Sequence, residues 1–419
     1  MDDAGQLYVT ERVGADGVRV LKRFDFETWQ PAAEPFVSSP GFDFIGSVLR
    51  ERGTGTAQAV RLTTDAETTV WLDPQLKALQ ERMDQRFPGQ VNRLQCRRCG
   101  QPDAVALVRS FSDRNPGALW LYRAAPGEGQ PMWQAVAQVN PGIPSSRMAT
   151  VDLHRIRARD GRDLPVWITT PAGASRTQPP PAVVLVHGGP WVRGVTWGWR
   201  PMSQFLASRG YVVIEPEFRG STGYGEAHFK AGWKQWGQAM QDDVADALRW
   251  AQSSQRAGPQ ACIMGGSYGG YSTLMGLVRH PELYRCGVSY LAVTDLKLLL
   301  EGSWLVNDDL SDLNRRYTLP QMVGDAKVDA AMIHANSPVE QADKIKAPLL
   351  LAMGELDRRV PLAHGKRMRD ALEAAGNPPQ WVVYPGEGHG WGLLQHRIDF
   401  AERVERFLAQ HLTAPAAPK

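Results

Sequence analysis

ACIMGGSYGGY, residues 261–271, is the stretch that decides the fold of this chain. A short apolar run leads into the pattern Gly-x-Ser-x-Gly centred on Ser267, and the apolar segment YGGYSTLMGLV follows. This order predicts a strand, a sharp turn and a helix. Glycines favour such a turn because its backbone is strained and the helix and strand approach so closely that a Cβ would obstruct them. The sequence therefore places Ser267 at the tip of the turn.

Short apolar strands alternate with amphipathic helices around this turn, from the Pro-rich stretch TQPPPAVV onward. The alternation is typical of a doubly wound, mostly parallel sheet, in which the working residues lie on loops at the carboxyl ends of strands. We therefore expect an α/β fold of the α/β-hydrolase kind over 151–419, with Ser267 on its nucleophile elbow. The predicted strands are 182–187, 211–216, 261–265, 286–293, 348–354 and 380–385, and the predicted helices include 239–254, 268–280, 362–375 and 393–411.

Residues 1–150 show a different pattern. Short alternating runs such as QLYVTER and VRVLKRFDF, separated by Gly, Asp and Pro clusters, indicate a β-rich segment. One helix interrupts it, with Asp73 as N-cap and Leu76, Leu79 and Met83 on one face. Propeller blades repeat at roughly 40 to 50 residues, so the segment has room for about three blades, fewer than close a propeller. We expect a partial, propeller-like domain.

The charges and apolar runs exclude two classes of partner. Lys and Arg total 47 and Asp and Glu 44, mixed along the chain without a basic block, so nucleic acid is not an expected partner. No apolar run approaches the roughly 18 residues that cross a bilayer, and the start MDDAGQLYVTERVG is acidic, unlike a signal peptide. As given, the chain is expected to be cytoplasmic. Its abrupt start inside a β-rich segment suggests missing upstream sequence, which would leave a periplasmic or secreted location open.

The four cysteines are Cys96, Cys99, Cys262 and Cys286, too few for a disulfide scaffold of this size and consistent with a reducing compartment. The pair Cys96 and Cys99 could suggest zinc, but a structural zinc site needs four ligands and no second CxxC or paired histidines follow. A β-hairpin that carries two cysteines is the preferred interpretation. No metal or organic cofactor is expected.

A serine hydroxyl becomes a nucleophile only with a base in hydrogen-bond reach and a third group that orients the base. His389, His396 and His411 follow a late strand, and only His389 lies in a Gly-rich loop, PGEGHGWG, directly after one. His396 and His411 fall in the predicted terminal helix, where surface positions are expected. His389 is the predicted base, with a capping or core role as the alternative.

The acid is expected on the loop after the preceding strand, where PLLLAMGELDRRVP offers Glu355 and Asp357. Asp357 is favoured because the chain turns at DRRVP before the next helix, whereas Glu355 lies closer to the strand end. Capping of helix 362–375 by either carboxylate is the structural alternative.

Acyl transfer also needs N–H donors that point at the developing oxyanion, each contributing roughly 3 kcal/mol. The run HGGP, residues 187–190, follows a predicted strand and exposes the backbone amide of Gly189. Tyr268, the residue after the nucleophile, supplies a second amide. A tight loop without a catalytic role is the alternative for HGGP.

Five ordered motifs resemble the prolyl oligopeptidase family of serine peptidases, nearer its acylaminoacyl-peptidase and dipeptidyl-peptidase-like branch. They are VHGGPW (186–191), FRGSTGYGE (218–226), GGSYGGY (265–271), GELDRRVP (354–361) and YPGEGHGW (384–391), and the likeness extends from about residue 150 to the end. The resemblance implies a triad of Ser267, Asp357 and His389, with Gly189 and Tyr268 as oxyanion donors.

The sequence departs from this family at two points. Prolyl oligopeptidase and dipeptidyl peptidase relatives place a tyrosine hydroxyl in the oxyanion hole where this chain has His187, so the hole is expected to consist of amides alone. Family members usually carry a complete propeller that selects substrates by size, and this chain has room for less than half of one.

Two further expectations concern the surroundings of the active site. FRGSTGYG is expected to pack near it, and Val293 and Trp304 are proposed to line an apolar substrate pocket.

Three functions follow from these observations. The first is a serine peptidase that hydrolyses oligopeptides or acyl-peptides through an acyl-enzyme. The second is a carboxylesterase that acts on small esters, because a shortened propeller leaves the site open. The third is a non-catalytic interaction module, which the complete set of triad residues argues against. The preferred residue before the scissile bond, the endo- or exopeptidase mode and homo-oligomerisation are left open by the sequence.

Overall fold

The computed structural model describes residues 5–51, 55–97, 103–124, 131–301 and 313–412, apart from the side chains of Arg97 and Arg315. The chain forms two compact units. The first unit runs to Val151 and includes two later segments, Thr196–Gln204 and Thr222–Ala227. The second comprises Asp152–Val195, Phe205–Ser221 and the chain from His228 onward.

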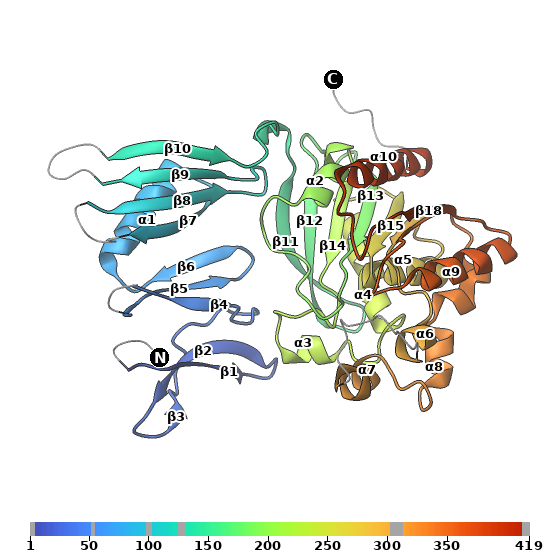
Figure 1. Cartoon of the computed structure of the whole chain (residues 1–419), viewed down its shortest axis with the longest axis horizontal. Coiled ribbons are helices and arrows are strands. Elements are labelled where there is room, and N and C mark those ends of the chain that lie inside the picture. Colours follow the sequence, from blue (N-terminus) through green and yellow to red (C-terminus); the bar gives the residue numbers. More distant parts are fainter. Residues whose placement is uncertain (1–4, 52–54, 98–102, 125–130, 302–312, 413–419) are drawn as a thin grey trace. The chain divides into compact units, whose positions relative to one another are not determined.

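Three small sheets make up the described strands of the first unit, in the orders β1-β2-β3, β4-β5-β6 and β10-β9-β8-β7 (Figure 1). Within the described residues, the strand pairs of these three sheets are antiparallel. The predicted β-rich character of this segment is thus confirmed, and its division into about three propeller blades stays a prediction. The strands are β1 (Tyr8–Val13), β2 (Val18–Asp25), β3 (Gln30–Pro31), β4 (Gly46–Arg50), β5 (Ala57–Thr63), β6 (Glu67–Trp71), β7 (Val91–Arg97), β8 (Val105–Phe111), β9 (Ala118–Arg123) and β10 (Met132–Gln138).

Helix α1 (Pro74–Arg86) lies between β6 and β7 in the chain. The Asp73 carboxylate accepts the Gln75 and Leu76 backbone N–H groups at 2.7 and 3.1 Å, which satisfies two amides that the first helical turn leaves unpaired. Leu76, Leu79 and Met83 are buried, and the last two pack against β7 and β8 residues. The predicted helix, cap and apolar face are confirmed.

The second unit contains an eight-stranded sheet in the order β11-β12-β14-β13-β15-β16-β17-β18. β12 pairs with β14 in antiparallel fashion, and the pairs from β14 through β18 are parallel. This is the predicted α/β-hydrolase sheet, preceded by a β-rich segment. Its strands are β11 (Thr150–Arg157), β12 (Asp163–Thr170), β13 (Ala182–Val186), β14 (Val212–Pro216), β15 (Ala261–Gly266), β16 (Cys286–Tyr290), β17 (Leu349–Gly354) and β18 (Gln380–Tyr384).

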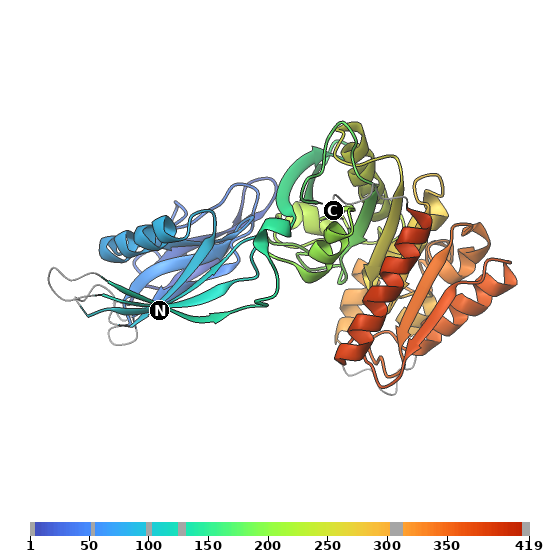
Figure 2. The ribbon, with the colours of Figure 1, turned by 90° about the horizontal axis from the view of Figure 1, so that it is seen from above.

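Helices cover the sheet because its central strands have no exposed face. All residues of β13, β14 and β17 are buried, as expected of parallel strands with both faces covered. Figure 2 shows α10, in red, running along the sheet, and α10 contacts β16 while α5 contacts β15 and β16. Each fully buried aliphatic side chain in this core contributes roughly 1.5–3 kcal/mol.

The helices end within a residue or so of their predicted limits where a prediction was made. The helices that follow α1 are α2 (Pro201–Ser208), α3 (Glu226–Lys230), α4 (Ala239–Ser253), α5 (Tyr268–Arg279), α6 (Leu296–Glu301), α7 (Leu319–Met322), α8 (Ala330–Ala335), α9 (Leu362–Ala374) and α10 (Leu394–His411). The predicted strand 286–293 is too long. It ends at Tyr290, because Leu291 adopts a left-handed backbone conformation with a φ of 51° that turns the chain out of the sheet.

Two further features concern the cysteines and the membrane. Cys262 on β15 and Cys286 on β16 form a disulfide, and Cys96 is also disulfide-bonded, whereas the sequence suggested thiols in a reducing compartment. Cys262 and Cys286 lie opposite each other in the register of the two strands. None of the helices in the described part of the chain combines the length and apolar character that a bilayer-spanning segment needs.

Candidate active site

Ser267 lies between β15 and α5 at the predicted turn, with a φ of 59° that L-residues rarely adopt. A Cβ at Gly265 would overlap the backbone of Gly269, and a Cβ at Gly269 would overlap the carbonyl of Val186 on β13. The two glycines therefore permit the close approach of strand and helix that the turn requires. The backbone strain at Ser267 is characteristic of functional sites and presents its hydroxyl at the end of the strand.

His389 and Asp357 are brought together by neighbouring loops. His389 Nδ1 donates to Asp357 Oδ2 at 2.7 Å, and the other carboxylate oxygen accepts the Arg359 and Val360 backbone N–H groups at 2.9 Å each. The Asp357 side chain is fully buried. Three donors therefore fix the carboxylate, which in turn orients the imidazole. Glu355, the other candidate acid, accepts the backbone N–H of Gly386 instead.

The three predicted triad residues share one edge of the sheet. Ser267 follows β15, Asp357 follows β17 and His389 follows β18, and β15 to β18 are successive parallel neighbours. The carboxyl ends of parallel strands lie at the same edge. Among the described residues, Ser267 Oγ and His389 are not hydrogen-bonded to each other. Catalytic hydrogen bonds are often long without substrate and shorten when it binds.

The loop over 187–195, hereafter the 187–195 loop, follows β13 and passes beside Ser267. A Cβ on Gly188 would lie 3.3 Å from the Cβ of Ser267, so the loop backbone passes next to this side chain. Gly189 has a φ of 120°, and a Cβ there would lie 2.9 Å from Val192. Tyr268 begins α5, where backbone N–H groups have no acceptor within the helix.

His187 occupies the position at which some relatives of the resembled family carry a tyrosine. Its Nδ1 donates to the Gly188 carbonyl at 2.7 Å, and the Ser221 hydroxyl donates to its Nε2 at 3.0 Å. Its ring stacks on Phe218 with centroids 4.4 Å apart. Both ring nitrogens are thus engaged, which supports an oxyanion hole of amides. Within the motif FRGSTGYG, Phe218 and Ser221 thus contact His187; the packing of the motif near an active site stays a prediction.

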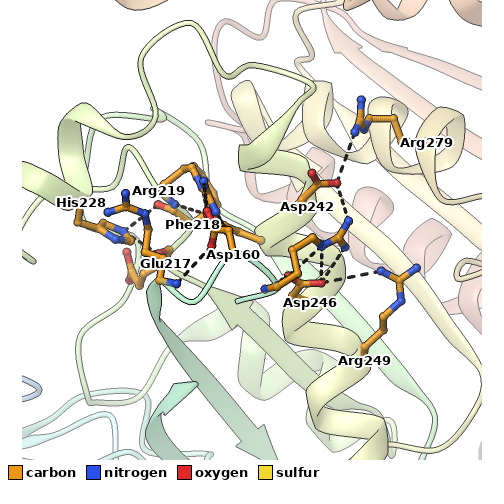
Figure 3. Close-up of polar contacts among 12 residues, drawn as sticks. Asp160, Glu217, Phe218, Arg219, His228, Asp242, Asp246, Arg249 and Arg279 are labelled. Carbon is orange, nitrogen blue, oxygen red and sulfur yellow. Dashed lines mark hydrogen bonds and ion pairs between the residues drawn. The ribbon is translucent and has the colours of Figure 1, made fainter. Parts of the chain in front are cut away.

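The side chains of Arg219 and His228, both buried, make polar contacts that hold the turn containing Phe218 (Figure 3). Arg219 donates to Asp243 at 2.6 and 2.8 Å and to Asp160 at 2.8 Å. Burial opposes its charge, but the bonds to Asp243 raise the pKa of the guanidinium overall. His228 Nε2 donates to the Glu217 and Phe218 carbonyls, and burial lowers the pKa of this imidazole to about 4. His228 is therefore neutral at pH 7.

Glu387 supports the His389 loop and was not singled out from the sequence. Its carboxylate accepts the Gly392 and Leu393 backbone N–H groups at 2.7 and 2.9 Å and the Nδ1–H of His396 at 2.8 Å. The backbone bond from Gly392 is the main reason that its pKa is lowered. Its place inside the Gly-rich run PGEGHGWG, two residues before His389, is the sequence signal that could have indicated this supporting role. His396, expected at the surface, anchors the loop through this contact.

The predicted substrate pocket is described only in part. Val293 is 4% exposed and belongs to the main hydrophobic core of the second unit; its role in a pocket stays a prediction. Trp304 lies outside the described residues. Within the described ranges, no group of three or more His, Cys, Asp or Glu residues is arranged to hold a metal ion.

The amino-acid sequence is similar to those of known peptidases. The chain is 33% identical over 383 residues to "Dipeptidyl aminopeptidase BIII" of Pseudoxanthomonas mexicana, covering 89% of this chain and 54% of that protein. It is 27% identical to the "Acylamino-acid-releasing enzyme" of Sus scrofa, covering 60% of this chain and 34% of that protein. The chain thus spans about half the length, or less, of these curated relatives.

A solved structure of a puromycin-hydrolysing peptidase from Mycobacterium tuberculosis superimposes with a TM-score of 0.73 at 21% identity, covering 96% of this chain and 61% of that one. At this identity the likeness shows the fold. A sequence profile described as "Prolyl oligopeptidase family" matches residues 197–415. Because that match extends over more than half of the chain, we conclude that the chain belongs to the prolyl oligopeptidase family.

Proposed function

We propose that this chain carries the active site of a serine peptidase that cleaves peptide or acyl-peptide bonds through an acyl-enzyme. One observation carries the proposal. The buried carboxylate of Asp357 holds His389 Nδ1 at 2.7 Å, at the sheet edge where the strained turn presents Ser267. A carboxylate that orients an imidazole near a partly exposed serine is the arrangement that acyl transfer requires.

In the proposed reaction, Ser267 Oγ forms a bond to the substrate carbonyl carbon while its proton passes to His389 Nε2. Asp357 stabilises the resulting imidazolium. Collapse of the tetrahedral intermediate breaks the C–N bond, and His389 returns the proton to the leaving amine. A water molecule then attacks the acyl-enzyme with His389 again as base, which releases the acid and restores Ser267.

The backbone amides of Gly189 and Tyr268 are the proposed donors to the oxyanion. Gly188 passes beside Ser267, so the next amide of the 187–195 loop lies on the side of the nucleophile. The Tyr268 amide begins the helix that follows the nucleophile, where N–H groups and the helix dipole favour negative charge.

Labelling with a fluorophosphonate tests the nucleophile. The chain should react once, and Ser267→Ala should lose both labelling and hydrolysis. Ser272→Ala is a matched control, because Ser272 lies on α5, is fully buried and donates to Gln241 rather than facing the turn. Equal labelling of wild type and Ser267→Ala would exclude Ser267 as the nucleophile.

A substrate series tests the bond type. Dipeptide and acetyl-aminoacyl p-nitroanilides should be cleaved, because the family's curated relatives are named as a dipeptidyl aminopeptidase and an acylamino-acid-releasing enzyme. Hydrolysis confined to short-chain p-nitrophenyl esters would replace the peptidase with a carboxylesterase. Binding of peptides without turnover of either substrate class would favour a non-catalytic module.

A further inference from the structure

We propose that Glu217 and Ser221 are positioning residues that hold the 187–195 loop, and with it the Gly189 amide, at the oxyanion position. The inference rests on the proposed function and names residues that act through the loop without touching the substrate. Glu217 and Ser221 lie on the turn after β14, which the sequence motif FRGSTGYG overlaps.

Glu217 fixes the far end of the loop. Its carboxylate accepts the Val195 backbone N–H at 2.6 Å and the Gly194 backbone N–H at 3.0 Å, one on each oxygen. The Glu217 side chain is fully buried. Because hydrogen bonds donated to a carboxylate inside a protein are stronger than those between neutral groups, the two bonds hold the adjacent peptide units of Gly194 and Val195 in one orientation.

Ser221 fixes the near end through His187. Its hydroxyl bonds to His187 Nε2 at 3.0 Å, and the same nitrogen lies 3.7 Å from the Glu217 carboxylate. His187 Nδ1 in turn donates to the Gly188 carbonyl, which belongs to the same planar peptide group as the Gly189 amide. A Cβ on Gly194 would overlap the His187 ring, so the two ends of the loop meet at this imidazole.

Further polar contacts hold the turn that carries both residues, and Figure 3 draws those around Glu217, Phe218, Arg219 and His228. His228 bonds to the Glu217 carbonyl at 3.0 Å, and Arg219 pairs with Asp243 on α4. The 187–195 loop is therefore tied to the core of the second unit at both of its ends. An oxyanion donor must keep its position while charge develops, and a donor displaced by a fraction of an ångström loses much of its effect.

The test measures amide hydrolysis by Glu217→Gln, which keeps the shape of the side chain but has one acceptor oxygen for two amides. Removal of a whole oxyanion donor lowers kcat by about 100- to 1,000-fold. Displacement of the loop should therefore lower kcat by about tenfold or more, with KM changed less than about twofold, because the effect appears in the transition state. Ser221→Ala keeps the carboxylate and should lower kcat in the same direction by about threefold or more.

A peptide aldehyde with the acyl part of the substrate provides a readout that a purely structural role would not move. Its hemiacetal places an oxyanion in the hole, so its inhibition constant should rise by the same factor as kcat/KM falls in the two variants. Val404→Ala, which truncates a fully buried side chain on α10, is the control for general destabilisation. Val404→Ala should leave kcat/KM and the inhibition constant of the aldehyde unchanged.

Ser267→Ala, measured in the same assay, separates the two proposals. Retained hydrolysis in Ser267→Ala would overturn the proposed function. If Ser267→Ala loses hydrolysis, the proposed function stands. If Glu217→Gln then has the same kcat and the same affinity for the aldehyde as Val404→Ala, only the positioning role is overturned. If Glu217→Gln does not fold, Ser221→Ala decides the matter by the same two measurements.

Discussion

Acidification from pH 7 to pH 4.5 is expected to destabilise the second unit through two buried histidines. Burial is the main cause that lowers the pKa of His228 to about 4 and that of His364 to about 4. For His228, Arg162 and Arg219 add to this effect, and for His364 the nearby Asp295 opposes it. Each imidazole is therefore buried in its neutral form.

The sign follows from linkage. The pKa of each histidine is about 4 in the folded chain, whereas a solvated imidazole, as in the unfolded chain, has an ordinary pKa of 6.5. As the pH falls below 6.5, the unfolded chain takes up protons first, so stability is fully present above pH 6.5 and is lost towards pH 4. At about 1.4 kcal/mol per pKa unit, the complete loss is roughly 3 kcal/mol for each histidine, and about three quarters of it is reached at pH 4.5.

Urea unfolding followed by tryptophan fluorescence at several pH values between 7 and 4.5 measures this loss. His228→Gln keeps a donor towards the Glu217 carbonyl, and His364→Asn keeps an acceptor for the Thr294 amide. Each variant should flatten the dependence of the unfolding free energy on pH by about 1.2 kcal/mol per pH unit near pH 5.25, which corresponds to about 0.9 proton. A slope equal to that of the wild type in both variants would refute the reasoning, since carboxylates contribute equally to all three proteins.

Three further predictions concern stability and loop order. Glu387→Gln should lower kcat by about fivefold while leaving fluorophosphonate access intact, because one of two loop amides loses its acceptor; an unchanged kcat would contradict this. Asp243→Asn should reduce the unfolding free energy by about 3 kcal/mol, because it removes the buried charged partner of Arg219 and leaves only the more exposed Asp160, and a loss below about 1 kcal/mol in urea titrations would argue against it. Cys262→Ala with Cys286→Ala should cost about 3 kcal/mol from loop closure across a separation of 24 residues, read as a lower melting temperature; an unchanged melting temperature would count against that estimate.

Local patterns were sufficient to predict most of the helices and strands and the turn that carries Ser267. The apolar run before Ser267, its flanking glycines and the helix after it lie within 261–271, so the whole turn is encoded in consecutive residues. The same holds for α1, whose cap and buried face follow from spacing alone. The end of β16 was missed, because a left-handed residue such as Leu291 interrupts a strand without changing its apolar pattern.

The sequence by itself determined the α/β-hydrolase sheet, the order of its working loops and the candidates for each catalytic role. Only the tertiary structure decided which atoms meet: that Asp357 rather than Glu355 bonds to His389, and that Cys262 faces Cys286. It also assigned Glu217 to amides more than twenty residues away. The physical reason is that periodicity reports which face of an element is buried, whereas a hydrogen bond depends on which strands are neighbours and in what register.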